Sequence, residues 1–181
     1  MATTQGFSLD REDHRADAYA FTLVRRHLVD PDGGSFDRDV VKHMGAVAVI
    51  PVDDDLRVHL VRQFRAPLLE AIVETPAGLC DHAGEERIVT AHRELAEEVG
   101  LVATSMVHLV DCWNSPGYST QVTSIFLATG LSPVEVAPDG VEERFFEQLV
   151  VPLEDLLDPT HGTVDAITML AALLAHRHLR R

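Results

Sequence analysis

The most informative part of this 181-residue chain is the segment Gly78-Leu-Cys-Asp-His-Ala-Gly-Glu85, followed after seven residues by Arg93-Glu-Leu-Ala-Glu-Glu-Val-Gly-Leu101. Four of its apolar residues recur at the i, i+3, i+7 and i+11 spacing of one helix face, namely Ile88, Ala91, Leu95 and Val99. Gly100 then supplies a left-handed C-terminal cap, and Leu101 is the apolar residue that commonly follows such a cap. The segment therefore predicts a core-facing helix over about residues 85 to 99.

Three glutamates gather on one flank of this helix, close to its C-terminal end. Glu94, Glu97 and Glu98 stand at i, i+3 and i+4, so their carboxylates share a side and repel one another. The last turn, where a helix favours cations, holds two of them, and each such placement costs a few tenths to about 1 kcal/mol. A hard cation such as Mg²⁺ prefers oxygen ligands of this kind and binds phosphate oxygens directly. The glutamates therefore indicate a metal site, and a solvated acidic face without chemistry is the alternative interpretation.

Outside this segment the chain alternates between strand-like and helix-like stretches. Asp30-Pro-Asp-Gly-Gly34 is typical of a hairpin turn between strands at 20–29 and 36–44. Further predicted elements are strands at 46–52, 56–64, 104–113, 121–129 and 145–151, a Pro-, Asp- and Gly-rich loop at 132–144 and an amphipathic helix at 165–179. The pattern predicts an α/β fold with a sheet between two helical layers. We expect a loose N-terminus over residues 1–15, a β-hairpin over 16–44 and the main domain over 45–181.

The charge balance limits the partners of this protein. The chain has 15 Lys and Arg against 29 Asp and Glu, which gives a net charge of −14. Such a surface repels nucleic-acid phosphates, so we expect no nucleic-acid partner, and an anionic substrate would need a mediating cation. The apolar stretches are interrupted by charge well short of a membrane span, so no membrane partner is expected. A polar beginning and two isolated cysteines, Cys80 and Cys112, predict a reduced, cytoplasmic protein.

The whole segment resembles the Nudix box, which reads Gly, five residues, Glu, seven residues, then Arg-Glu-aliphatic-any-Glu-Glu-any-Gly-aliphatic. This chain has six residues between Gly78 and Glu85, and it matches the second half at every fixed position. Glu74-Thr-Pro-Ala-Gly78, Arg62-Gln-Phe-Arg65 and Ser115-Pro-Gly-Tyr118 resemble motifs of the ADP-ribose pyrophosphatase branch of that family. The resemblance implies a Nudix α/β/α sandwich with a mixed sheet and an N-terminal β-hairpin extension.

The metal site follows from the resemblance position by position. It implies that Glu94 and Glu98 are the principal metal ligands and that the backbone carbonyl of Ala77 completes the shell. Glu97 is implied as a third or water-mediated ligand and is counted among the candidate catalytic residues. The expected cofactor is Mg²⁺, with Mn²⁺ as a substitute. The structural positions of the box are Gly78, Glu85, Arg93 and Gly100, with Glu85 and Arg93 expected to pair.

The resemblance also assigns the base. In this branch the general base is a glutamate on a loop after the box, which implies Glu143 or Glu142, with Glu143 slightly favoured and a solvated acidic loop as the alternative. Many relatives carry a further glutamate shortly after the Ser-Pro-Gly loop, where this chain has Thr120-Gln121. If that glutamate assists binding or catalysis in the relatives, another residue performs this role in the present chain or the role is lost.

Substrate contacts are expected from a strand and from aromatic side chains. Arg65 is the candidate for the diphosphate or ribose because a guanidinium can grip phosphate oxygens in bidentate fashion, and Gln63 belongs to the same candidate set. An aromatic platform for the base could come from Phe21, Trp113 or Tyr118. For Phe21 and Trp113, a place in the hydrophobic core is the favoured interpretation, and a stacking role is the alternative.

The implied activity is Mg²⁺-dependent hydrolysis of the pyrophosphate bond of ADP-ribose or a related nucleoside diphosphate sugar, giving AMP plus a sugar phosphate. The implied assembly is a homodimer formed through the N-terminal strands. A Nudix hydrolase acting on another nucleoside diphosphate derivative, such as GDP-mannose or a dinucleotide, is one alternative. A non-catalytic Nudix nucleotide sensor is a second, and the presence of all three carboxylates argues against it.

Overall fold

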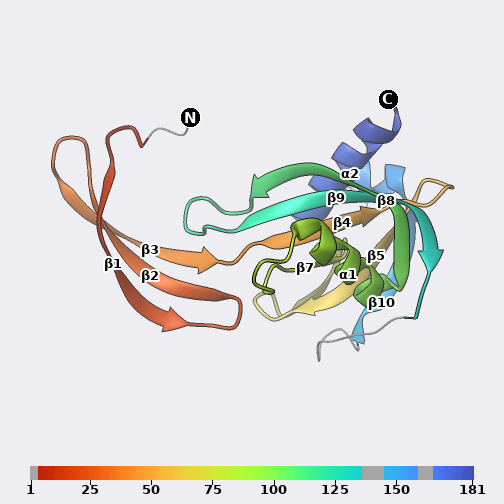
Figure 1. Cartoon of the computed structure of the whole chain (residues 1–181), viewed down its shortest axis with the longest axis horizontal. Helices are drawn as coiled ribbons and strands as arrows, with labels where there is room; N and C mark the ends of the chain where they lie inside the picture. The colour runs from red at the N-terminus through yellow and green to blue at the C-terminus, as the bar shows by residue number, and fades with distance from the viewer. Residues whose placement is uncertain (1–3, 136–144, 159–164) are drawn as a thin grey trace. The chain divides into compact units, whose positions relative to one another are not determined.

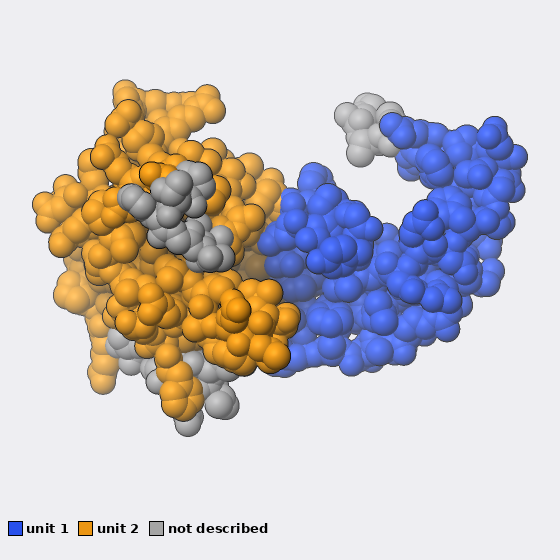
Figure 2. All heavy atoms as spheres, turned by 180° about the vertical axis from the view of Figure 1, so that it is seen from behind, with its two compact units in different colours: residues 1–45, 113–122 blue, residues 46–112, 123–181 orange. Residues whose placement is uncertain are grey.

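The computed structural model describes residues 4–135, 145–158 and 165–181 (Figure 1). Its elements, in chain order, are β1 (Ser8–Asp17), β2 (Phe21–Val29), β3 (Ser35–His43), β4 (Ala46–Pro51), β5 (Arg57–Arg65), β6 (Glu70–Glu74), β7 (Ala77–Leu79), α1 (Arg87–Val99), β8 (Leu101–Trp113), β9 (Val122–Pro133), β10 (Glu147–Pro152), the 3-10 helix η2 (Leu153–Leu157) and α2 (Ala166–Leu179). They divide into two compact units. Unit 1 contains residues 1–45 and 113–122, and unit 2 contains residues 46–112 and 123–181 (Figure 2).

Unit 1 is built on an antiparallel sheet in the order β1-β2-β3. The predicted hairpin is confirmed, because β2 pairs with β3 from Phe21 opposite His43 to Val29 opposite Ser35. Asp30 shapes the turn by accepting hydrogen bonds at Oδ1 from the backbone N–H groups of Asp32 (2.9 Å) and Gly34 (2.7 Å). This is the local bonding that makes Asp a favoured residue in tight turns.

The N-terminus differs from the expected loose segment, because β1 begins at Ser8 and pairs with β2 along its length. Its cross-strand partners are charged. Glu12 accepts hydrogen bonds from Arg26 (2.9 Å) and Lys42 (2.8 Å), and Asp13 lies 3.0 Å from His27 Nε2. A strand held by ion pairs between strands has no alternation of apolar and polar residues, which is the signal that identifies most half-buried strands.

Unit 2 contains two sheets, in the orders β7-β4-β9-β8 and β10-β5-β6. β4 runs parallel to β9, with Ala46 opposite Thr123 and Pro51 opposite Ala128, and antiparallel to β7. The other sheet is antiparallel, with β5 pairing β10 on one side and β6 on the other. The predicted mixed α/β architecture is confirmed.

The fully buried strand β4 lies between the two helices of unit 2 (Figure 1). Its alternate residues face opposite ways. Ala48 and Ile50 belong to a core cluster that includes three alanines of α2, at positions 171, 172 and 175. Val47 and Val49 belong to a second cluster that includes Ala91 and Leu95 of α1. Burial on both sides explains why this strand reads as a continuous apolar run, and it produces the predicted layers.

The buried face of α1 contains three of the four residues that the apolar spacing predicted, and it is wider than that stripe. Ala91, Leu95 and Val99 are buried, whereas Ile88 in the first turn is 37% exposed. Glu94 and Glu98 are buried as well, next to the apolar stripe on the helical wheel. The helix therefore packs two of its acidic residues inward. Within the described ranges, no helix has the length and apolar character needed to cross a bilayer.

Candidate active site

The site is organised by the C-terminal half of α1, which ends in the predicted left-handed cap. Gly100 has φ 64° and ψ 39°, and its N–H donates to the carbonyl oxygens of Ala96 and Leu95. β8 starts at the next residue, so the cap fixes the direction in which the helix enters the sheet. The last turn contains no basic residue. Glu97 and Glu98 therefore stand at the negative end of the helix dipole without compensation from that turn.

Glu94 and Glu98 converge on the strand β7. The Oε2 atom of Glu98 accepts a hydrogen bond from the backbone N–H of Ala77 at 3.0 Å. The Glu94 carboxylate lies directly against Gly78, where an added Cβ would be 1.9 Å from Oε1. Glu94 is 7% exposed and Glu98 is 5% exposed. Gly78 is therefore required for space, and two carboxylates are packed side by side against two consecutive residues of β7.

Arg93 is the cation that the structure places beside these acids. Its Nη1 atom lies 2.9 Å from Glu94 Oε1 and 2.8 Å from Glu97 Oε2, and its Nη2 atom lies 3.9 Å from Asp81 Oδ1. Its Nε atom is buried without a hydrogen-bond partner among the described residues. Arg93 thus neutralises part of the acidic flank, and its orphaned Nε shows that its bonding is incomplete.

The expected direct pair of Glu85 with Arg93 is not what the structure contains. Glu85 instead accepts a hydrogen bond from the Thr90 hydroxyl at 2.7 Å, and its carboxylate lies 3.5 Å from His82 Nδ1. The pKa of Glu85 is lowered, first by the Thr90 hydrogen bond and then by the positive charge of Arg93 acting at longer range. The loop before α1 contains one residue more than the motif, and Glu85 ties that loop to the first turn of the helix through Thr90.

The donor set fits a hard divalent cation. Glu94, Glu97 and Glu98 offer only carboxylate oxygens, and Glu94 and Glu98 are buried together, where an adjacent cation offsets their repulsion. No three His, Cys, Asp or Glu side chains form a ready-made metal cluster in the part of the chain that the structure describes. Arg93 stands between Glu94 and Glu97, and Glu98 is turned to the Ala77 N–H. The carbonyl of Ala77 remains a predicted ligand.

Arg65 and Gln63 lie on β5, and both are engaged with Glu74 at the end of β6. Arg65 Nε donates to Glu74 Oε1 at 2.8 Å, and Arg65 Nη2 donates to Glu74 Oε2. Gln63 is buried and reaches the same carboxylate through a long contact of 3.5 Å from Nε2 to Oε2. Hydrogen bonding to Glu74 raises the pKa of Arg65, and the charges of Glu74, Glu98 and Asp165 act in the same direction. The Gln63 side chain is thus directed to Glu74, and the guanidinium of Arg65 is also influenced by the negative charge of Glu98.

The aromatic candidates belong to unit 1. Tyr118 is 60% exposed, Trp113 is 67% exposed, and Phe21 is also exposed at the start of β2. The interpretation of Phe21 and Trp113 as core residues is therefore wrong. The Ser-Pro-Gly loop is attached to β3, because Tyr118 O accepts from Val41 N–H (2.8 Å) and Thr120 N–H donates to Val41 O (2.9 Å).

The two base candidates, Glu142 and Glu143, lie outside the described residues. Sequence reasoning gave no role to Glu74, although its motif was recognised. The spacing contained a signal for this role. Gln63 and Arg65 lie two residues apart and so share one face of a strand, and a buried acid such as Glu74 needs a partner of their kind.

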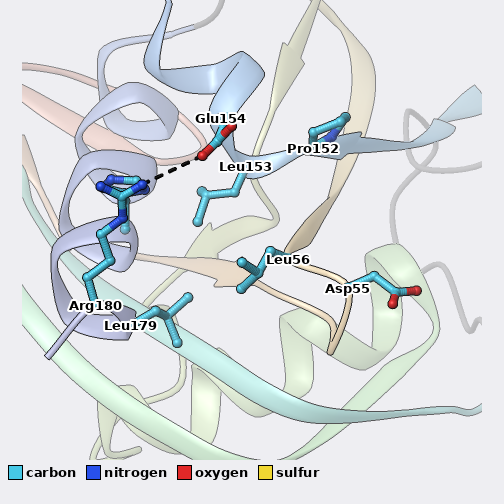
Figure 3. Close-up of a pocket in the computed structure, with 8 residues that line it drawn as sticks. Asp55, Leu56, Pro152, Leu153, Glu154, Leu179 and Arg180 are labelled. Atoms are coloured by element: carbon cyan, nitrogen blue, oxygen red, sulfur yellow. Dashed lines mark ion pairs between the residues drawn. The ribbon is translucent and has the colours of Figure 1, made fainter.

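A separate hollow of unit 2 contains none of the candidate residues (Figure 3). It has a volume of about 350 Å³ and is lined by Asp55, Leu56, Pro152, Leu153, Glu154, His176, Leu179 and Arg180. Its polar rim includes an exposed ion pair between Arg180 and Glu154 at 3.6 Å. This hollow lies between η2, the end of α2 and the turn before β5, so it is not part of the carboxylate site.

Comparison with known proteins gives a consistent result. The NUDIX domain profile matches residues 42–173. An ADP-ribose pyrophosphatase of Bacillus subtilis is 42% identical over 127 residues, which cover 70% of this chain and 68% of that protein. An ADP-ribose pyrophosphatase of Mycobacterium tuberculosis is 45% identical over 114 residues, which cover 63% of this chain and 55% of that protein. A crystal structure of an ADP compounds hydrolase aligns with a TM-score of 0.82 at 25% identity, covering 99% of this chain and 97% of that one.

Proposed function

This chain belongs to the Nudix family, and from that membership we propose that it hydrolyses the pyrophosphate bond of ADP-ribose to give AMP and a sugar phosphate. The observation that carries the proposal is the packing of Glu94 and Glu98 against Ala77 and Gly78 inside the matched domain. Two buried carboxylates side by side, one of them in the last turn of a helix, are destabilising by themselves. Their arrangement becomes favourable when a divalent cation and a diphosphate occupy the site.

The metal would be Mg²⁺ or Mn²⁺, held by Glu94 and Glu98 with Glu97 and the Ala77 carbonyl in support. A divalent cation in such a site supplies charge neutralisation for the two phosphates and a lowered pKa for the attacking water. Arg93 stabilises two of these three glutamates when the metal is absent, since its Nη1 atom is within 3 Å of Glu94 and Glu97. The fit is supported by the all-oxygen donor set and by the space that Gly78 leaves for Glu94.

The remaining steps are assigned to residues of this chain. Arg65 would contact the diphosphate, and Glu143 or Glu142 would accept the proton of the attacking water. Tyr118 and Phe21, both exposed, would provide a stacking surface for the adenine. One of the two P–O bonds of the P–O–P bridge is broken. One phosphate leaves with the bridging oxygen, and the other receives the oxygen of the attacking water, so the products are two monophosphates.

We also propose a cytoplasmic homodimer that pairs through the sheet of unit 1. β1 is an edge strand of that sheet, and it carries the exposed side chain of Leu9, with Phe7 just before it. An edge strand with exposed apolar residues is a surface on which a second copy can pair. Light scattering coupled to gel filtration tests the assembly, and a monomer of about 20 kDa would refute it.

The activity is tested by incubating the purified protein and Mg²⁺ with ADP-ribose, GDP-mannose, a dinucleotide and a nucleoside triphosphate. ADP-ribose should give the highest kcat/KM, with AMP as a product and no turnover in EDTA. Turnover confined to nucleoside triphosphates would overturn the assignment. Glu98→Gln serves as the inactive reference, because it removes one of the two buried carboxylates while keeping the shape of the side chain.

A further inference from the structure

The sequence predicts that the Arg65 guanidinium binds a phosphate group in bidentate fashion. In the structure, two of its nitrogens are already bound to a protein carboxylate. Nε and Nη2 both donate to the carboxylate of Glu74. Among the contacts of the described residues, none involves Arg65 Nη1. A grip through the Nε–Nη2 edge is therefore not open to the substrate as long as Glu74 holds it, and the N–H groups at the Nη1 end of the guanidinium are left for a ligand.

We propose that Glu74 is a positioning residue, which holds the Nε–Nη2 edge of Arg65 so that the opposite, Nη1 end of the guanidinium is presented to the substrate's diphosphate. The proposal rests on the function proposed above, and it adds that the Arg65 contact is made by this end and depends on a buried partner. Gln63 supports the arrangement from the same face of β5, with Nε2 3.5 Å from Glu74 Oε2.

The backbone explains why these three side chains meet. β5 and β6 are antiparallel, with Val61 opposite Glu74. Residues two apart on a strand point to the same side, so Val61, Gln63 and Arg65 share a face with Glu74. Val61 is fully buried, Glu74 is 6% exposed, and Arg65 at the end of the strand is partly exposed. The face therefore runs from the core to the solvent, and Arg65 is where a ligand could first reach it.

The charges around Arg65 indicate that Glu74 orients the guanidinium in addition to forming a buried ion pair with it. A buried carboxylate without a partner is costly, so Glu74 requires the guanidinium for its own stability. Arg65 also experiences the charges of Glu98 and Asp165, which are two further acids of unit 2. Without a fixed orientation, the guanidinium could turn toward these acids instead of toward a phosphate. Glu74 removes that freedom.

A double-mutant cycle tests the proposal with ADP-ribose and saturating Mg²⁺. Glu74→Gln keeps the shape and removes the charge, so KM should rise roughly tenfold while kcat changes less than about twofold, because the contact is made equally in the bound substrate and in the transition state. Arg65→Ala should raise KM by about 10- to 100-fold. The double variant should be no worse than Arg65→Ala, because Glu74 acts only through Arg65.

The matched control is Glu147→Gln. Glu147 on β10 forms an ion pair with Arg62 at 3.1 Å. Arg62 lies on the same strand as Arg65, β5, but its side chain points to the opposite face of the sheet. This change removes an Arg–Glu ion pair from the same sheet, and it should leave KM at the wild-type value. Thermal unfolding of each variant verifies folding. If Glu74→Gln does not fold, Glu74→Asp replaces it, since the shortened carboxylate cannot reach both nitrogens, and the same rise in KM is expected.

Two results would overturn the positioning role alone. The first is an unchanged KM in a folded Glu74 variant of an enzyme that turns over ADP-ribose. The second is a full additional loss when the Glu74 change is placed on Arg65→Ala, which indicates an independent structural effect. A wild-type protein that does not hydrolyse ADP-ribose refutes the proposed function, and the positioning role with it.

Discussion

Replacing Gly78 by alanine should weaken the response to Mg²⁺ far more than it weakens the fold. A Cβ at this position would lie 1.9 Å from Glu94 Oε1 and 2.0 Å from Glu94 Cδ. The carboxylate would have to move by about 1.5 Å to reach ordinary van der Waals contact. The atoms in the way belong to the end of a flexible side chain, and Gly78 has no left-handed backbone conformation. The strain is therefore relieved by displacing Glu94.

The two effects differ in size. Metal–ligand distances are held to within roughly 0.2 Å, so a carboxylate displaced by more than an ångström no longer binds the same cation. We expect the half-saturating Mg²⁺ concentration to rise at least 10- to 100-fold, which is the loss seen when weaker, supporting contacts of a metal site are removed. The free energy of unfolding in EDTA should fall by about 1 kcal/mol, the lower end of the cost of an overpacked site. Initial rates against Mg²⁺ concentration and thermal unfolding in EDTA measure both.

Gly34→Ala is the matched control for this experiment. Its Cβ would lie 2.5 Å from Asp30 Oδ2, so it also presses on a flexible carboxylate, but in the hairpin turn of unit 1. A similar small loss of stability and an unchanged Mg²⁺ response are expected. If Gly78→Ala is folded and keeps the wild-type Mg²⁺ dependence, Glu94 is not a metal ligand and the reasoning is wrong.

Three further predictions address the site, the backbone and the pH dependence. Glu98→Gln should abolish most of the activity, yet without metal it should unfold at the wild-type temperature or slightly above, because it removes a carboxylate from the negative end of α1; a strongly destabilised variant would contradict this. Leu69→Gly should raise the free energy of unfolding by about 0.5–1 kcal/mol in a denaturant titration, because Leu69 has φ 56° and is exposed, whereas Leu68→Gly, without a positive φ, should lower it. Burial lowers the pKa of His43, whose Nδ1 accepts a hydrogen bond from Gly45 N–H, so the unfolded chain takes up the proton first as the pH falls. Stability from this group is therefore complete above about pH 6.5 and is lost below it, and His43→Asn should flatten that part of the curve of unfolding free energy against pH, while an identical slope would refute the assignment.

Much of unit 2 could be predicted because its sequence signals are local. The helix period, the Gly100 cap and the apolar run of β4 each follow from backbone geometry and burial within one element. β1 was missed because its stabilising contacts are long-range charge pairs, such as that of Glu12 with Lys42, which leave no apolar period. β6 and β7 were missed because strands as short as Ala77–Leu79 have too few residues for any pattern.

The site shows the same division. The three glutamates and their common flank could be predicted from their spacing on one helix. The burial of Glu94 and Glu98, and the choice of Glu74 as the partner of Arg65, depend on which strands approach the helix and the arginine. That information is tertiary. A single sequence contains the residue types for these contacts. It does not show that Arg65, which lies opposite Glu70 in the register of β5 with β6, reaches along the sheet to Glu74 instead.

The most direct test of the central claim is a crystal structure with Mn²⁺ and a non-hydrolysable ADP-ribose analogue, with anomalous data that locate the metal. The account predicts an anomalous peak roughly 2.0–2.3 Å from carboxylate oxygens of Glu94 and Glu98, bridged to the analogue's diphosphate, with Arg93 moved off Glu94. Diphosphate density in the matched domain with no metal at these two carboxylates, or a metal held elsewhere, would contradict it.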